Sequence, residues 1–229
     1  MFGAFYTSQD VVSSAFAAAL LATFSTAILC FLGLTWSGDK WRLPVAMVGV
    51  AAMASAMHYA GATSLWLVAQ KASGGIRFSG WFTVQPLQVA AVYFFARTMD
   101  KIPVGVFWRM TVAAVLMVFS RYLGDAGFFS PTLGALLSIG FWLYILGEMY
   151  FGAMPDAIRK GSRAVRLGFF WIRLIFTIGW AIYPILHFVD VVIGAGQSPG
   201  VITLYTLFDL INLITPSLIV LAVAGQERY

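Results

Sequence analysis

Long apolar runs alternate with short polar segments along the whole chain. A transmembrane helix needs about 20 mostly apolar residues, and seven runs reach that length. They cover residues 11–34, 44–69, 79–98, 104–123, 132–152, 167–193 and 201–224. The polar segments between them are too short to form a soluble domain, so residues 1–229 are expected to be one domain. Because short connections place consecutive helices side by side, the pattern predicts an all-α membrane protein, an antiparallel bundle of seven transmembrane helices.

Composition excludes several classes of protein. Of the 229 residues, 61% are hydrophobic and only 10% are charged, whereas an ordinary soluble domain carries about 25% charged residues. So few charges cannot cover a water-facing surface, which excludes a soluble enzyme, a disordered protein and a nucleic-acid binder. The partner that the composition predicts is the lipid bilayer. The single Cys30 provides neither a disulfide framework nor a metal cluster.

The distribution of basic residues predicts the orientation of the bundle. One set of alternate loops and helix ends carries most of them: Lys40, Arg42, Arg97, Lys101, Arg109, Arg159, Lys160, Arg163, Arg166 and Arg228. The opposite set carries Lys71, Arg77 and Arg121. Cytoplasmic loops of membrane proteins are enriched in Lys and Arg. The N-terminus is therefore predicted to lie outside and the C-terminus in the cytoplasm.

Asp209 is the most informative polar residue, because it lies near the middle of the last apolar run. A lone carboxyl group at membrane depth needs a cation or several hydrogen-bond donors. The nearest plausible cation is Arg77, at the outer end of the third helix and just before the third apolar run. Two interpretations stay open. Asp209 is either a counterion or proton-path group, or half of a buried Arg77–Asp209 pair that only fixes helix packing.

Two of the runs predict an apolar slot in the core. Helical spacing places one set of side chains on a single face of the third helix: Arg77, Trp81, Val84, Gln88 and Ala91. The sixth run places Trp180, Tyr183, Pro184 and His187 on one face in the same way. Pro86 should kink the third helix and release a carbonyl group. Aromatic faces on two helices indicate a flat slot, and plain aromatic core packing remains the alternative.

The sequence contains no enzyme constellation. It has no metal motif, no Ser or Cys nucleophile with a nearby histidine and no glycine-rich phosphate loop. His58 has no second metal ligand at a fitting spacing, and Asp125, near a helix end, carries no specific signal of its own. We therefore expect no metal site and no enzyme.

Five short segments together resemble one protein family. They are MHY at 57–59, IRFSGW at 76–81, RYLGDAG at 121–127, GWAIYP at 179–184 and YTLFDLIN at 205–212. In order and spacing they are similar to helices two, three, four, six and seven of the microbial rhodopsins, closest to the proteorhodopsin and xanthorhodopsin group. The resemblance implies a seven-helix retinal protein in a prokaryotic inner membrane.

The chain departs from this family at the residues that the family uses for chemistry. The lysine that forms the retinal Schiff base, one turn after the seventh-helix aspartate, is Leu213. The proton acceptor before the third-helix tryptophan is Gly80, and the proton donor further along is Ala91. The resemblance therefore implies that covalent retinal cannot form and that the family's light-driven proton pumping is lost.

Other positions keep the residues of the family. Trp81, Trp180, Tyr183 and Pro184 match the residues that line retinal, and Gln88 matches a position that tunes colour. Arg77 and Asp209 match the outer arginine and the second counterion. His58 matches the histidine that pairs with the missing acceptor. Gly134 and Ala135 are small where some relatives keep a window for a carotenoid antenna.

Three hypotheses from different classes follow. In the first, the slot binds retinal, a carotenoid or another isoprenoid non-covalently, and the protein is a sensor, store or carrier. In the second, the protein is a pigment-free scaffold in a homo-oligomer, or in a mixed oligomer with a true rhodopsin, because family members form rings. In the third, it is an enzyme or transporter of a new kind, for which the sequence offers no reactive group.

Overall fold

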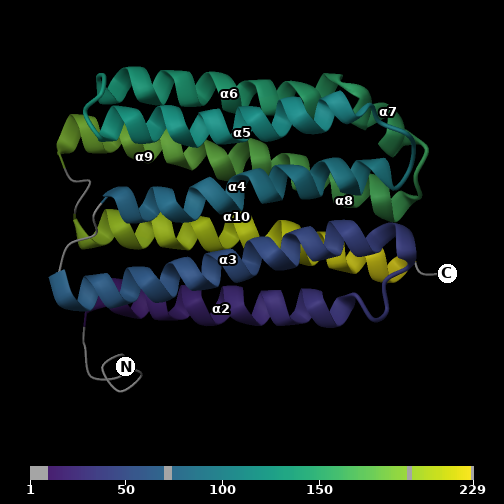
Figure 1. Ribbon diagram of the computed structural model, residues 1–229, viewed down its shortest axis with the longest axis horizontal. Helices are drawn as coiled ribbons and strands as arrows, with labels where there is room; N and C mark the ends of the chain where they lie inside the picture. The colour runs from purple at the N-terminus through teal and green to yellow at the C-terminus, as the bar shows by residue number, and fades with distance from the viewer. Residues whose placement is uncertain (1–9, 70–73, 195–197, 228–229) are drawn as a thin grey trace.

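The computed structural model describes residues 10–69, 74–194 and 198–227, and every element in this part of the chain is helical. The helices lie side by side along the long axis of the molecule (Figure 1). Their bounds are α2 Val11–Gly33, α3 Asp39–Ala69, α4 Gly74–Arg97, α5 Val104–Asp125, α6 Pro131–Phe151, α7 Ala153–Arg159, α8 Arg163–Leu174, the π-helix η1 Ile175–Gly179, α9 Trp180–Ile193 and α10 Pro199–Gln226.

The prediction of a seven-helix bundle is confirmed. The segments α8, η1 and α9 follow one another without a break and cross the bundle as one unit, so the described residues form seven long helical segments. Consecutive helices α2 to α6 pack in pairs, and α10 closes the bundle against α2, α3 and α8. The segment at 153–166, expected to be a loop, is mostly helical. It contains α7 and the start of α8. The side chain of Ser162 caps the N-terminus of α8.

Six of the described helical stretches are long and apolar enough to cross a membrane, and α4 is not among them. Its lower hydropathy has a structural cause. Gln85 and Gln88 lie on its inner side, where they are only 7% and 5% exposed. Since α4 packs between α3 and α5, its polar side chains face protein rather than lipid.

Local signals start several helices where the structure has them. Ser130, Ser162 and Ser198 each accept a hydrogen bond from the backbone N–H three residues further on, which satisfies one of the unpaired donors of a helix N-terminus. Pro131 and Pro199 occupy the first helical position after two of these caps, where a missing N–H costs nothing.

The basic loops and the C-terminal end of α10 lie at the same end of the bundle. Lys40, in the first turn of α3, lies 3.5 Å from Glu227 at the end of α10. Lys160 forms an ion pair with Asp100 across two loops, and this hydrogen bond lowers the pKa of Asp100. The assignment of this end to the cytoplasm remains a prediction.

The contact between α5 and α6 depends on small residues. A Cβ atom on Gly134 would lie 2.7 Å from the backbone oxygen of Ser120 and 2.9 Å from Cα of Gly124. Gly134 therefore permits close helix packing. The suggestion that Gly134 and Ala135 leave a window for a carotenoid stays a prediction.

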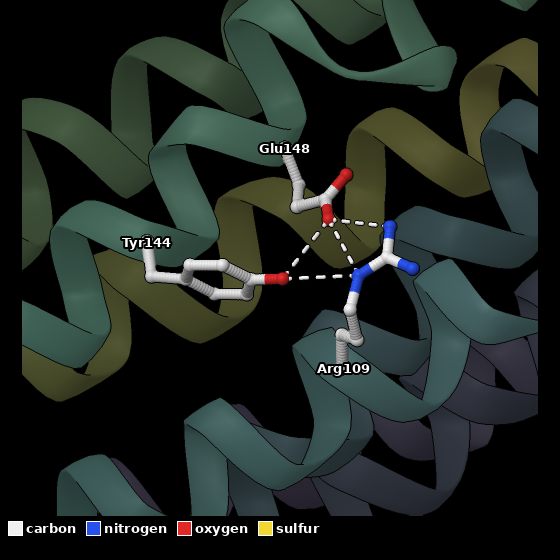
Figure 2. A network of polar contacts seen from close by, with 3 residues as sticks. All are labelled: Arg109, Tyr144 and Glu148. Carbon is white, nitrogen blue, oxygen red and sulfur yellow. Dashed lines mark hydrogen bonds and ion pairs between the residues drawn. The ribbon is translucent and has the colours of Figure 1, made fainter.

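A polar cluster joins the same two helices further along (Figure 2). Arg109 of α5 donates to Glu148 of α6 from Nη2 at 2.8 Å and from Nε at 3.0 Å. Tyr144 accepts from Arg109 Nε at 3.0 Å and donates to Glu148 at 3.2 Å. The Arg109 side chain is 54% exposed, so this cluster lies on the outer surface of the bundle.

Candidate ligand-binding site

A carboxyl group lies where four helices of the bundle meet. Asp209 of α10 accepts hydrogen bonds from Tyr59 Oη of α3 at 2.9 Å and from Trp81 Nε1 of α4 at 3.2 Å. It also accepts one from Tyr183 Oη of α9 at 2.7 Å. The requirement for several donors, inferred from the position of Asp209 in the last apolar run, is met by these three neutral groups. Tyr59 was not among the expected site residues, although it belongs to the MHY segment.

The expected direct pair between Arg77 and Asp209 is not formed. Among the described side chains, no ion pair within 4.0 Å contains Arg77. Its guanidinium group instead lies over the ring of Tyr205 at 4.0 Å, and 6.0 Å from the Trp81 ring. Asp209 does not require a direct cation, because three donors already bind its two oxygens. Arg77 and Asp209 therefore interact electrostatically at longer range and not as an ion pair in direct contact.

Two side-chain amides fix α10 against its neighbours. Gln88 Nε2 donates to the backbone oxygen of Asn212 at 2.7 Å. Pro216 has no N–H to bond that oxygen, so Gln88 supplies the missing donor. Asn212 Nδ2 donates to the backbone oxygen of Gly179 at 2.9 Å and to Tyr183 Oη at 3.1 Å. Gln88, which the sequence placed in the wall of the slot, therefore also binds the backbone of α10. Asn212 was not among the expected site residues.

The π-helix η1 sets the position of Trp180. A π-helical turn alters the normal backbone bonding of a helix, and side chains from other helices bind two of its carbonyl groups. Trp142 Nε1 of α6 donates to the Phe176 oxygen at 2.8 Å, and Asn212 binds that of Gly179. Trp180 follows directly and stacks on Phe176 with ring centroids 4.4 Å apart. No sequence pattern indicated this turn.

We expect Gly179→Ala to disrupt the contact between η1 and α10. An added Cβ would lie 1.9 Å from Asn212 Oδ1, so Asn212 must move and lose its bonds to Gly179 and Tyr183. The expected loss is about 2 kcal/mol or more, which corresponds to a fall in melting temperature of about 4–8 °C. Thermal unfolding of the purified protein measures it. The matched control is Gly140→Ala, where an added Cβ has open space, and an equal fall in both variants would contradict the expectation.

A cavity opens between the aromatic faces of α4 and α9. Its volume is about 50 Å³, measured as the space open to the centres of water-sized spheres. The walls are mostly apolar and come from five helices. They are formed by Arg77, Phe78, Trp81 and Gln85 of α4, Met117, Val118 and Arg121 of α5, Ala135, Ser138, Ile139 and Trp142 of α6, Trp180, Tyr183, Pro184 and His187 of α9, and Tyr205 of α10. We call this space the larger cavity.

Two residues of the larger cavity were read differently in the sequence. His187 was expected only as part of the sixth-helix face near its outer end, and it is 2% exposed and lines the cavity. Arg121 was counted among the basic residues of the outer side and as part of the RYLGDAG segment, but not among the residues of the slot. Its side chain is 13% exposed, forms an ion pair with Asp125 and also lines the cavity. The expected site residue Asp125 is therefore the ion-pair partner of a residue in the cavity wall.

A smaller cavity lies on the other side of Trp81 and Tyr183. Its volume, measured in the same way, is only about 20 Å³, enough for about one water molecule. Its walls include Asp209, Val84, Gln88 and Leu213. Leu213 is 2% exposed and packs in one apolar cluster with Ala27, Ala51 and Ala52. The Leu213 side chain thus helps to close this part of the core.

Two further expected residues, His58 and Gly80, line the smaller cavity, whereas Ala91 does not. The His58 ring covers Gly80 so closely that a Cβ on Gly80 would lie 2.6 Å from His58 Cγ. A larger residue at position 80 therefore requires His58 to move. Ala91 is 1% exposed and belongs to the main hydrophobic core, away from both cavities.

Comparison with known proteins decides the family. A family model described as bacteriorhodopsin-like protein matches residues 11–226. The chain belongs to the bacteriorhodopsin-like proteins. This confirms the resemblance to microbial rhodopsins. A green-light absorbing proteorhodopsin of Gamma-proteobacterium EBAC31A08 is 24% identical over 221 residues, which are 96% of this chain and 89% of that protein.

Solved structures of similar proteins have the same fold. The blue light-absorbing proteorhodopsin from Med12 is 26% identical, with a TM-score of 0.80 over 95% of this chain and 100% of the other. Xanthorhodopsin, a light-driven ion pump with dual chromophore, has a TM-score of 0.82 over 94% of this chain and 92% of its own. At 18% identity that likeness shows the fold alone. This bacteriorhodopsin-like protein is an integral membrane protein, and its bacterial relatives support a prokaryotic plasma membrane as its location.

Proposed function

We propose that this protein binds retinal, or another isoprenoid such as a carotenoid, non-covalently in the larger cavity, as a sensor, store or carrier. The observation that carries the proposal is the cavity itself, a narrow apolar space bordered by Trp81, Trp142 and Trp180. Burial of apolar surface contributes about 25 cal/mol per Å². A flat hydrocarbon can therefore bind in such a space without a covalent bond.

We infer that no retinal Schiff base forms. Leu213, one turn after Asp209, has no amine. Lys40 lies in the first turn of α3, and Lys101 and Lys160 lie in the connections that follow α4 and α7. Lys71 falls outside the described residues. Without a Schiff base, and with Gly80 and Ala91 at the acceptor and donor positions, proton pumping by the mechanism of the family is not part of this proposal. Neither is an enzymatic activity.

We expect purified protein to bind all-trans retinal and all-trans retinol with quenching of tryptophan fluorescence, because three tryptophans border the cavity. The absorption of bound retinal should stay in the near ultraviolet. Ala135→Phe and Ser138→Phe both place a ring in the cavity and should weaken binding at least about tenfold. Leu136→Phe is the matched control, since Leu136 is 54% exposed on the same helix.

Two results would contradict the proposal. One is the absence of quenching and of thermal stabilisation by either retinoid. The other is equal binding by Ala135→Phe, Ser138→Phe and the wild type.

A pigment-free scaffold is the second candidate, and the tight packing of Leu213 favours it. In that case the protein assembles as a homo-oligomer or with a true rhodopsin. Native mass spectrometry of the protein extracted from its own membrane tests this role. An assembly that forms without retinoid, together with failure of every retinoid titration, would favour the scaffold.

A further inference from the structure

The carboxylates near the larger cavity are not part of its lining, which contains two arginines. Arg77 and Arg121 both line it, and arginine stays protonated in proteins. Asp125 pairs with Arg121. Among the described side chains, Arg77 has no carboxylate within 4.0 Å and lies over the Tyr205 ring. Asp209 borders the smaller cavity, on the other side of Trp81, and interacts with Arg77 only at longer range. Two cations and no carboxylate therefore line a cavity whose remaining walls are mostly apolar.

Both arginines lie at one end of the cavity. Arg77 is in the first turns of α4, and Arg121 is in the last turns of α5. Figure 1 shows the start of α4 and the end of α5 at the same end of the bundle, which is the predicted outer end. The other end of the cavity is formed by Trp142, Trp180 and Met117, deeper in the helices. The cavity thus combines a cationic mouth with an aromatic interior.

An excess cation in a low-dielectric environment is stabilised by an anion, and carboxylates match the guanidinium group geometrically. A neutral retinoid would leave the imbalance unchanged. We propose that the natural ligand is an isoprenoid acid, whose carboxylate lies between Arg77 and Arg121 and whose conjugated tail extends between Trp81 and Trp180. This inference rests on the proposed function, because it names the class of ligand for the same cavity.

Paired ligands test the inference. All-trans retinoic acid and all-trans retinol share a tail and differ in the head group. We expect the acid to bind wild-type protein at least about tenfold more tightly at neutral pH, from fluorescence quenching titrations. Palmitic acid should displace retinoic acid poorly, because a saturated chain is not flat. Equal competition by palmitic acid would overturn the isoprenoid part of the inference.

Substitutions locate the head group. Arg121→Gln should weaken retinoic acid binding about tenfold and leave retinol unchanged, and Arg121→Lys should retain part of the preference. The matched control is Arg109→Gln, which removes another α5 arginine from an ion pair but lies outside the cavity (Figure 2). It should change neither affinity. All three variants are first compared with wild type by melting temperature.

The outcomes separate the two proposals. Equal binding of acid and alcohol by wild-type protein would overturn the carboxylate inference and leave the proposed function in place. An equal loss of both ligands in Arg121→Gln would also overturn it, since Arg121 would then act on the shape of the cavity. Failure of wild-type protein to bind any retinoid would overturn both. The comparison in wild-type protein needs no variant, so it stands even where a substitution prevents folding.

Discussion

Leu213→Lys protein supplied with all-trans retinal is expected to carry the chromophore covalently and to absorb visible light. Leu213 is buried beside the smaller cavity, which Asp209 also borders one helical turn away. A lysine there would place its amine near this carboxyl group, which can act as the counterion of a protonated Schiff base. Only the protonated Schiff base shifts retinal absorption far into the visible.

The measurement is the absorption spectrum of the purified protein, before and after reduction with borohydride, which fixes a Schiff base permanently. Leu213→Met is the matched control, because it has a similar volume and no amine. Wild-type and Leu213→Met proteins should show no visible band. Absence of a fixed adduct in folded Leu213→Lys protein would mean that retinal does not reach Leu213. A visible band in wild-type protein would mean that another lysine reacts.

Asp209→Leu is expected to destabilise the protein more than any other single substitution considered above. Its side chain accepts hydrogen bonds from Tyr59, Trp81 and Tyr183, which come from three different helices. Leucine leaves all three donors without that acceptor, and each buried unsatisfied donor costs about 1–3 kcal/mol. The expected loss is therefore about 3 kcal/mol or more, and thermal unfolding measures it.

Asp209→Asn should cost less than Asp209→Leu, because asparagine keeps the shape and one acceptor oxygen. The matched control is Asp156→Asn, which breaks an exposed ion pair with Arg159. Exposed pairs contribute about 0–1 kcal/mol, so this control should unfold almost like wild type. If Asp209→Leu also unfolds like wild type, the carboxyl group is not the centre of helix packing that its contacts indicate.

The packing around the smaller cavity fits the absence of two groups, the proton acceptor at Gly80 and the Schiff-base lysine at Leu213. His58 lies against Gly80, and Leu213 packs with alanines of α2 and α3. The contact of His58 with Gly80 occupies space that a longer side chain at position 80 would need, whereas Leu213 borders the smaller cavity, into which a lysine at this position would extend. The space that remains lies on the other side of Trp81, and we propose it as the ligand site.

The sequence by itself determined the class of protein and the number of long helices. The length of an apolar run is a local property, and a run of about 20 residues leaves no alternative to a membrane helix. The expected starts at 132 and 201 lie within two residues of the observed starts at Pro131 and Pro199. The aromatic residues Trp81 and Trp180 could be placed near one slot because helical spacing puts them on faces with other aromatic side chains.

Only the tertiary structure decided which partners these side chains have. Arg77 lies over Tyr205 instead of pairing with Asp209, and Arg121 faces a cavity rather than the loops. The π-helix before Trp180 and the close contact of Gly134 with α5 were equally absent from the pattern. Such contacts depend on how each helix is rotated about its axis and where its backbone departs from α-helical geometry. Helices from distant parts of the chain fix both, so the spacing of residues within one helix does not contain that information.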